Sequence, residues 1–192
     1  MGIYLNPRSK GFQSSLNSEI YVDKTDLLEQ TNRVLGTRQK FLCVSRPRRF
    51  GKSMAADMLA AYYSCGEDSS ELFDGLQISR AESYRKNLNQ YDVIKVNMQD
   101  FLSMAHSMDE MLEMLQRYLI RELTRSFEAV DFFDRTNLIQ MLKDIYAETD
   151  RAFVILIDEW DCLFREYQHD QVAQRKYLDF LRARSEERRA MK

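Results

Sequence analysis

The stretch SRPRRFGKSM, residues 45–54, lies between a short apolar run and a run rich in alanine. Its second half matches the end of the Walker A pattern Gly-x-x-x-x-Gly-Lys-Ser/Thr with Gly51, Lys52 and Ser53, whereas Arg46 stands at the first glycine. A phosphate-binding loop presents backbone N–H groups at the start of a helix, and glycine lets the backbone approach a ligand closely. The stretch therefore predicts a nucleotide site. Its alternatives are a basic patch for nucleic acid and a charged turn without a ligand.

The predicted phosphate loop gives its polar residues distinct roles. Lys52 is expected to reach the β- and γ-phosphates and to be catalytic, because its ammonium group neutralises their charge. Ser53 is expected to be a ligand of Mg²⁺ through its hydroxyl group. The residues expected to contact the nucleotide are Arg48, Arg49, Phe50, Gly51, Lys52, Ser53 and Met54.

Apolar runs on both sides of this loop predict an α/β fold. Residues 40–45 (KFLCVS) indicate a buried strand with Cys43 in the core, and residues 52–64 predict a helix. Two more strands are predicted at 91–98 and 151–161, with helical patterns between them. Unbroken apolar strands are typical of a mostly parallel sheet that helices cover on both faces. Ligands of such sheets bind at the carboxyl ends of the strands, where the phosphate loop lies.

A second motif follows the last predicted strand, in the sequence FVILIDEWD. Asp158 at the strand end is expected to contact Mg²⁺, and Glu159 is expected to be the general base that orients the attacking water. This arrangement is a Walker B strand of the Asp-Glu type, and its alternative is an acidic turn after a strand. Asp161 is either a third acid of the site or a residue that caps or pairs locally.

Composition limits the class of protein. The chain has 192 residues with a net charge of −2, which argues against a dedicated binder of duplex DNA. Three cysteines without close spacing and two histidines make a zinc site unexpected, and they fit reduced cysteines in a cytoplasmic protein. No stretch has the length of about 18 consecutive apolar residues that a membrane span requires, so no membrane contact is expected.

Four motifs in order resemble one family. YVDKT at 21–25, SRPRRFGKS at 45–53, LFDGL at 72–76 and DEWD at 158–161 are similar to the AAA-ATPase-like domain family of prokaryotes. The family usually has tyrosine where this chain has Trp160. The resemblance covers about residues 5 to 165. It implies that members of the family commonly lack the first glycine of the loop.

The resemblance implies a P-loop NTPase that binds ATP and Mg²⁺. Lys52 and Ser53 then carry over as phosphate and Mg²⁺ contacts, and Asp158 and Glu159 as the Walker B acids. The YVDKT stretch is expected to lie near the nucleotide base. The whole chain, 1–192, is expected to form one domain, with an N-terminal extension and helix (1–38), a nucleotide-binding core (39–165) and a charged C-terminal helix (166–192).

Members of the family are often longer, frequently with a nuclease-like domain at the C-terminus, so this chain is expected to be a truncated member. Three functions follow: an ATPase, a nucleotide-dependent switch that acts on a protein partner without turnover, and a nucleic-acid-binding module. In the third, the basic loop of Arg46, Arg48 and Arg49 contacts nucleic-acid phosphates. Homo-oligomers and nucleic-acid binding through the absent nuclease-like domain are further expectations.

Overall fold

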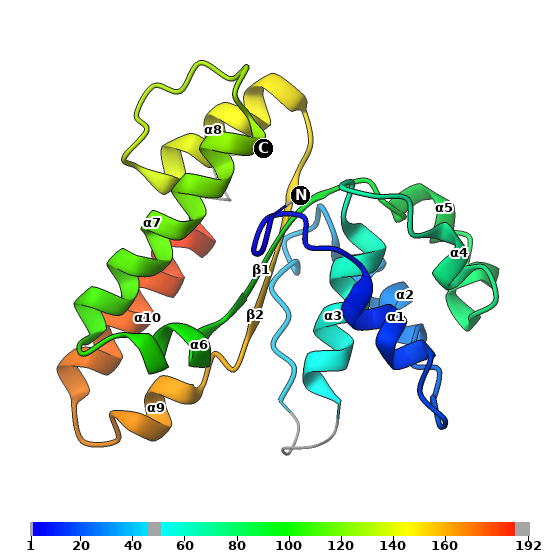
Figure 1. Cartoon of the computed structure of the whole chain (residues 1–192), viewed down its shortest axis with the longest axis horizontal. Helices are drawn as coiled ribbons and strands as arrows, with labels where there is room; N and C mark the ends of the chain where they lie inside the picture. The colour runs from blue at the N-terminus through cyan, green and yellow to red at the C-terminus, as the bar shows by residue number, and fades with distance from the viewer. Residues whose placement is uncertain (1, 46–50, 187–192) are drawn as a thin grey trace. The chain divides into compact units, whose positions relative to one another are not determined.

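The computed structural model describes residues 2–45 and 51–186, with side chains up to residue 181. Contacts within the chain divide it into two compact units. The first comprises Met1–Lys95 and Arg151–Leu156, and the second comprises Val96–Asp150 and Ile157–Lys192. Figure 1 labels the helices and strands of both units.

Short helices make up most of the first unit. The helix expected over 52–64 is confirmed as α3, which ends at Tyr63 because Ser64 leaves the helical conformation. The polar segment after it folds into three short helical pieces, and the side chain of Phe73 in the first of them is completely buried. The helices of this unit are α1 (Lys10–Leu16), α2 (Asp26–Val34), α3 (Lys52–Tyr63), α4 (Ser70–Phe73), the 3-10 helix η1 (Gln77–Arg80) and α5 (Tyr84–Asn87).

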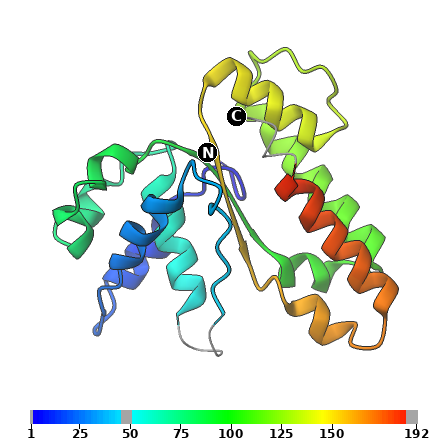
Figure 2. The same cartoon turned by 180° about the vertical axis from the view of Figure 1, so that it is seen from behind.

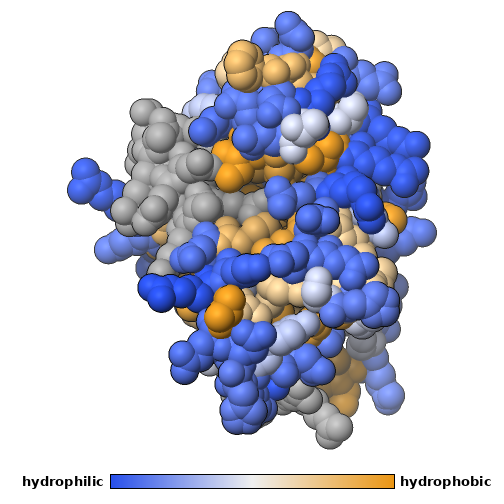
Figure 3. Space-filling view, turned by 90° about the vertical axis from the view of Figure 1, so that its left-hand side faces the viewer, coloured by the Kyte–Doolittle hydropathy of each residue, from blue (hydrophilic) through white to orange (hydrophobic). Residues whose placement is uncertain are grey.

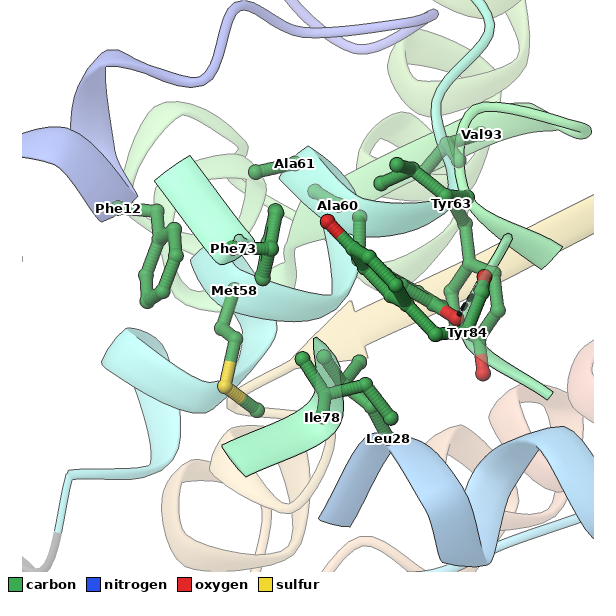
Figure 4. Close-up of a cluster of buried hydrophobic side chains, with 12 residues drawn as sticks. Phe12, Leu28, Met58, Ala60, Ala61, Tyr63, Phe73, Ile78, Tyr84 and Val93 are labelled. Atoms are coloured by element: carbon green, nitrogen blue, oxygen red, sulfur yellow. Dashed lines mark hydrogen bonds between the residues drawn. The ribbon is translucent and has the colours of Figure 1, made fainter. Parts of the chain in front are cut away.

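Aromatic side chains form the core of the first unit (Figure 4). Phe12 of α1 stacks on Phe73 of α4 with ring centroids 4.9 Å apart, and Tyr62 of α3 meets Phe73 edge-on at 5.4 Å. Tyr62 and Tyr63 are almost completely buried, and the Tyr62 hydroxyl donates to the backbone oxygen of Tyr84 over 2.8 Å. Burying these rings removes a large apolar surface from water, which stabilises α3 against the neighbouring short helices.

Helices α1 and α3 lie side by side in this unit (Figure 1). A Cβ atom on Gly11 would lie only 2.7 Å from Cγ of Asp57, so any larger residue at this point of α1 would displace the Asp57 carboxylate. Asp57 in turn forms an ion pair with Lys95, in the second half of the first strand. The helix that starts at the predicted phosphate loop is therefore fixed on one side by α1 and on another by a strand.

The two strands expected at 91–98 and 151–161 are confirmed as β1 (Asp92–Asn97) and β2 (Phe153–Asp158). They pair in parallel, and the backbone N–H of Asp92 donates to the oxygen of Ala152 over 3.2 Å. In the described part of the chain the sheet has these two strands, so it is smaller than expected. The residues of β2 are half-buried or exposed, whereas its unbroken apolar sequence predicts a fully buried strand.

The expectation of a buried strand at 40–45 is wrong for the described structure. No strand is assigned to these residues, and Cys43 is exposed instead of lying in the core. Phe41, Leu42 and Val44 are 46%, 55% and 47% exposed. An apolar pattern makes a strand possible, but a strand also needs a hydrogen-bonded neighbour, and among the described residues β2 pairs with β1.

A buried polar cluster joins the starts of both strands. The carboxylate of Asp92 is 1% exposed and accepts hydrogen bonds from Asn6 Nδ2 over 2.7 Å and from Arg151 Nε over 3.1 Å. It also accepts from the Cys65 thiol over 3.3 Å. Burial raises the pKa of that thiol to about 11, so it remains protonated and able to donate. These partners offset the large cost of burying the Asp92 charge.

The second unit consists mainly of helices. Ser107 starts α7 by accepting a hydrogen bond from the backbone N of Glu110 over 3.2 Å. Helix α10 lies beside α7 (Figures 1 and 2), and Lys176 of α10 forms an ion pair with Asp109 of α7 at 2.8 Å. Tyr177 of α10 is completely buried. The helices of this unit are α6 (Met98–Met104), α7 (Met108–Ser126), α8 (Leu138–Thr149), α9 (Cys162–Glu166) and α10 (Gln171–Glu186).

The surface is mixed in polarity. The face shown in Figure 3 is mostly hydrophilic, with smaller hydrophobic areas between the polar side chains. Among the described helices, none combines the length and the apolar character that crossing a membrane requires.

Candidate functional site

Helix α3 begins where the sequence predicts the end of the phosphate loop. Gly51 has a left-handed backbone with φ of 78°, a conformation that favours glycine because it has no Cβ atom. The Gly51 oxygen accepts the first helical hydrogen bond, from the N–H of Ala55 over 2.9 Å. Lys52 and Ser53 are the first two residues of α3, and Ser53 is exposed. The structure therefore places a lysine and an accessible hydroxyl at the start of a helix.

The start of α3 is electrostatically positive. Its first turn contains no acidic residue, and Asp57 in the second turn is paired with Lys95. The free N–H groups of a helix N-terminus carry a partial positive charge, to which Lys52 adds a full one. Met54 is partly exposed beside them. The remaining residues predicted to contact the nucleotide, Arg48, Arg49 and Phe50, lie outside the described residues.

The YVDKT stretch, residues 21–25, contributes a second lysine to this helix start. A Cβ atom built on Gly51 would lie 3.8 Å from Nζ of Lys24, which places the Lys24 ammonium group beside the N-terminus of α3. Sequence reasoning noted the stretch but gave Lys24 no role, because Lys24 and Gly51 are far apart along the chain. A local sequence pattern does not predict that a lysine at residue 24 lies next to the loop that ends at residue 51.

The second predicted motif follows β2. Asp158 is the last residue of β2 and is half-buried, and its Oδ1 accepts a hydrogen bond from the backbone N of Glu159 over 2.9 Å. Glu159 has φ of 50°, in the left-handed region that glutamate rarely adopts. Strained backbone of this kind concentrates at functional sites. The chain therefore turns sharply at the residue predicted to be the general base.

Arg165 of α9 binds both acids that follow Asp158. Its Nη2 donates to Oε2 of Glu159 over 2.7 Å, and its Nη1 donates to Oδ2 of Asp161 over 2.9 Å. The hydrogen bond to Glu159 raises the pKa of the Arg165 guanidinium group. Asp161 therefore pairs locally. Sequence reasoning missed Arg165, although the i, i+4 spacing of Asp161 and Arg165 is typical of an ion pair on a helix.

The family model described as "Predicted AAA-ATPase" matches residues 12–187. The chain belongs to the AAA-ATPase-like family. The match includes both α3 and the turn after β2, and it confirms the resemblance inferred from the four motifs. No curated protein and no solved structure matches the chain.

The residues of this AAA-ATPase-like protein suit a magnesium–nucleotide complex in their chemistry. Within the described ranges, no group of three or more His, Cys, Asp or Glu side chains could hold a metal ion. Mg²⁺ that arrives with a nucleotide does not need such a cage, because it keeps several waters and takes one or two protein oxygens besides the phosphates. The exposed hydroxyl of Ser53 and the half-buried carboxylate of Asp158 are oxygen donors of this kind.

Proposed function

We propose that this AAA-ATPase-like protein binds Mg·ATP and hydrolyses it, and that its two units belong to one P-loop NTPase domain. The observation that carries the proposal is the left-handed Gly51, followed at once by Lys52 and Ser53 at the start of a twelve-residue helix. A helix start of this form offers backbone N–H groups and a lysine to phosphate oxygens. Membership of the family supports the same activity.

Each residue has one task in this proposal. Lys52 binds the β- and γ-phosphates, and Ser53 and Asp158 hold Mg²⁺. Glu159 accepts a proton from the attacking water and orients it. Mg²⁺, when bound, neutralises part of the phosphate charge.

Titration with Mg·ATP tests nucleotide binding directly. We expect Lys52→Ala to weaken binding by about a hundredfold or more, since it removes a charge that pairs with phosphate in the site. Lys86→Ala is the matched control, because Lys86 is an exposed lysine on α5 of the same unit. Isothermal titration calorimetry of the three proteins measures the dissociation constants. Equal affinity of the wild-type protein and Lys52→Ala, or no binding to either, would contradict the proposal.

A nucleotide-dependent switch without turnover is the second candidate. The observation that favours it is the ion pair of Glu159 with Arg165, which occupies the carboxylate that hydrolysis needs. Under this function Mg·ATP binds, but Glu159→Gln leaves the slow rate of hydrolysis unchanged. The third function, binding of nucleic acid through Arg46, Arg48 and Arg49, stays a prediction because these residues lie outside the described part of the chain.

A further inference from the structure

Three sources of positive charge meet at the start of α3. They are the helix N-terminus, the side chain of Lys52 and the ammonium group of Lys24 beside Gly51. Within residues 2–45 and 51–181, no carboxylate forms an ion pair with Lys24 or Lys52, and the first turn of α3 has no acid. Like charges repel one another, and a bound anion offsets this repulsion.

Hydrogen bonds on both sides of Lys24 hold its backbone in place. Asp23 accepts from the backbone N and the hydroxyl of Thr25 over 2.9 and 2.7 Å, and from the backbone N of Gln77 over 2.8 Å. Thr25 is completely buried and its hydroxyl accepts from the backbone N of Ile78 over 3.1 Å. The stretch is thus anchored to η1, while the side chain of Lys24 remains exposed and extends to α3.

We propose that Lys24 is a second cationic contact for the phosphate chain of the nucleotide, in addition to Lys52. This role rests on the proposed binding of Mg·ATP at the start of α3. A polyphosphate carries several negative charges, so it is attracted to both lysines and to the positive end of the helix. The stretch 21–25 is then assigned to the phosphates and not to the base.

A ligand that lacks the nucleobase distinguishes a contact of Lys24 with the phosphates from a contact with the nucleobase. We compare binding of Mg·ATP and of Mg·tripolyphosphate by calorimetry for the wild-type protein, Lys24→Met, Lys24→Arg and the control Lys86→Met. We expect Lys24→Met to weaken binding of both ligands by roughly tenfold, the size of one lost charge-assisted hydrogen bond. Lys24→Arg should restore most of the affinity because it keeps the charge, and Lys86→Met should match the wild-type protein.

The outcomes distinguish failure of this role from failure of the proposed function. Unchanged affinity of Lys24→Met for both ligands, with wild-type binding intact, would overturn the role of Lys24 alone. A loss confined to Mg·ATP would also overturn it, because it would assign Lys24 to the base or the ribose. A wild-type protein that binds neither ligand would overturn the proposed function, and with it this role. Thermal melting of Lys24→Met checks that the exposed substitution leaves the fold intact.

Discussion

The start of α3 and the turn after β2 carry opposite charges, and they differ in what already neutralises that charge. At the start of α3, Lys52 and Lys24 lie beside a positive helix end, without an acid in the first turn. At the turn after β2, Glu159 and Asp161 both pair with Arg165. One region therefore has no acidic partner among the described residues, whereas a single guanidinium group partly neutralises the two acids of the other.

Because of this difference, we expect the two regions to affect nucleotide binding and ATP hydrolysis separately. A cationic site without acidic partners gains free energy from a bound polyphosphate, so under the proposed function we expect nucleotide binding to depend mainly on the first region. Hydrolysis also requires a carboxylate that can accept a proton, and the guanidinium group of Arg165 competes for that carboxylate in Glu159. The contrast predicts that substitutions at α3 change affinity and that substitutions at the turn change the rate.

The largest effect expected at the turn is that of Glu159→Gln. Removing the general base should lower the rate of ATP hydrolysis by about a hundredfold or more, because general base catalysis contributes effects of this size. Binding of Mg·ATP should remain, since glutamine keeps the shape of the side chain. Phosphate release assays and calorimetry measure the two quantities, with Glu166→Gln as the control for an exposed neighbouring acid. A loss of affinity equal to the loss of rate would break the contrast.

Gly51→Ala tests the region at α3. A Cβ atom at φ of 78° costs roughly 1–2 kcal/mol, so the helix start should lose its geometry and affinity for Mg·ATP should fall about tenfold. Hydrolysis at saturating nucleotide should change much less. Gly75→Ala is the control, because a Cβ atom there meets no other atom within 4 Å. Unchanged affinity of Gly51→Ala would show that this backbone conformation is not needed for binding.

Arg165→Ala sharpens the contrast by releasing Glu159. Exposed or partly exposed ion pairs contribute up to about 1 kcal/mol, so we expect the rate of hydrolysis to rise by about two- to fivefold. Affinity for Mg·ATP should stay constant. Arg175→Ala, an exposed arginine on α10, is the control in the same assay. A fall in rate would instead assign Arg165 to the positioning of Glu159.

The smallest effect concerns acid pH and the anchor of Lys24. Partial burial acts to raise the pKa of Asp23, but the hydrogen bonds from Thr25 and Gln77 outweigh it and hold this pKa below its usual value. A carboxylate of this kind adds stability above its unfolded pKa of about 3.9, and this stability is lost as pH falls through the lower folded pKa. Thermal melting from pH 6 down to pH 3 should therefore show a decrease below about pH 4 that is smaller in Asp23→Asn. Identical pH dependence of the melting temperature in the wild-type protein and Asp23→Asn would show that the Asp23 carboxylate does not stabilise residues 21–25.

Local patterns predicted part of the fold. Helix α3 and the strands β1 and β2 form where apolar periodicity placed them, because such patterns report which residues avoid water. The run at 40–45 has the same apolar character as β2, yet β2 pairs with β1 and residues 40–45 do not form a strand. Pairing is a relation between segments, and one segment's composition does not specify it.

The candidate site was predictable to a similar extent. Gly51, Lys52 and Ser53 were correctly placed at a helix start, because these three residues are consecutive and a helical sequence pattern follows them directly. The pairing of Arg165 with Asp161 follows the i, i+4 spacing of ion pairs on helices, so the sequence contains this contact. Lys24 was not predictable, because its position beside Gly51 depends on how η1 anchors residues 21–25.

The sequence by itself determined the family, the helix that starts at Lys52 and the acidic end of β2, since each depends on neighbours along the chain. Only the tertiary structure decided that Lys24 lies beside Gly51, that the buried Asp92 pairs with Arg151, and that residues 41–45 stay exposed. The physical reason is that charge pairing and strand pairing act through space between distant segments. Their partners are fixed only when the chain has folded.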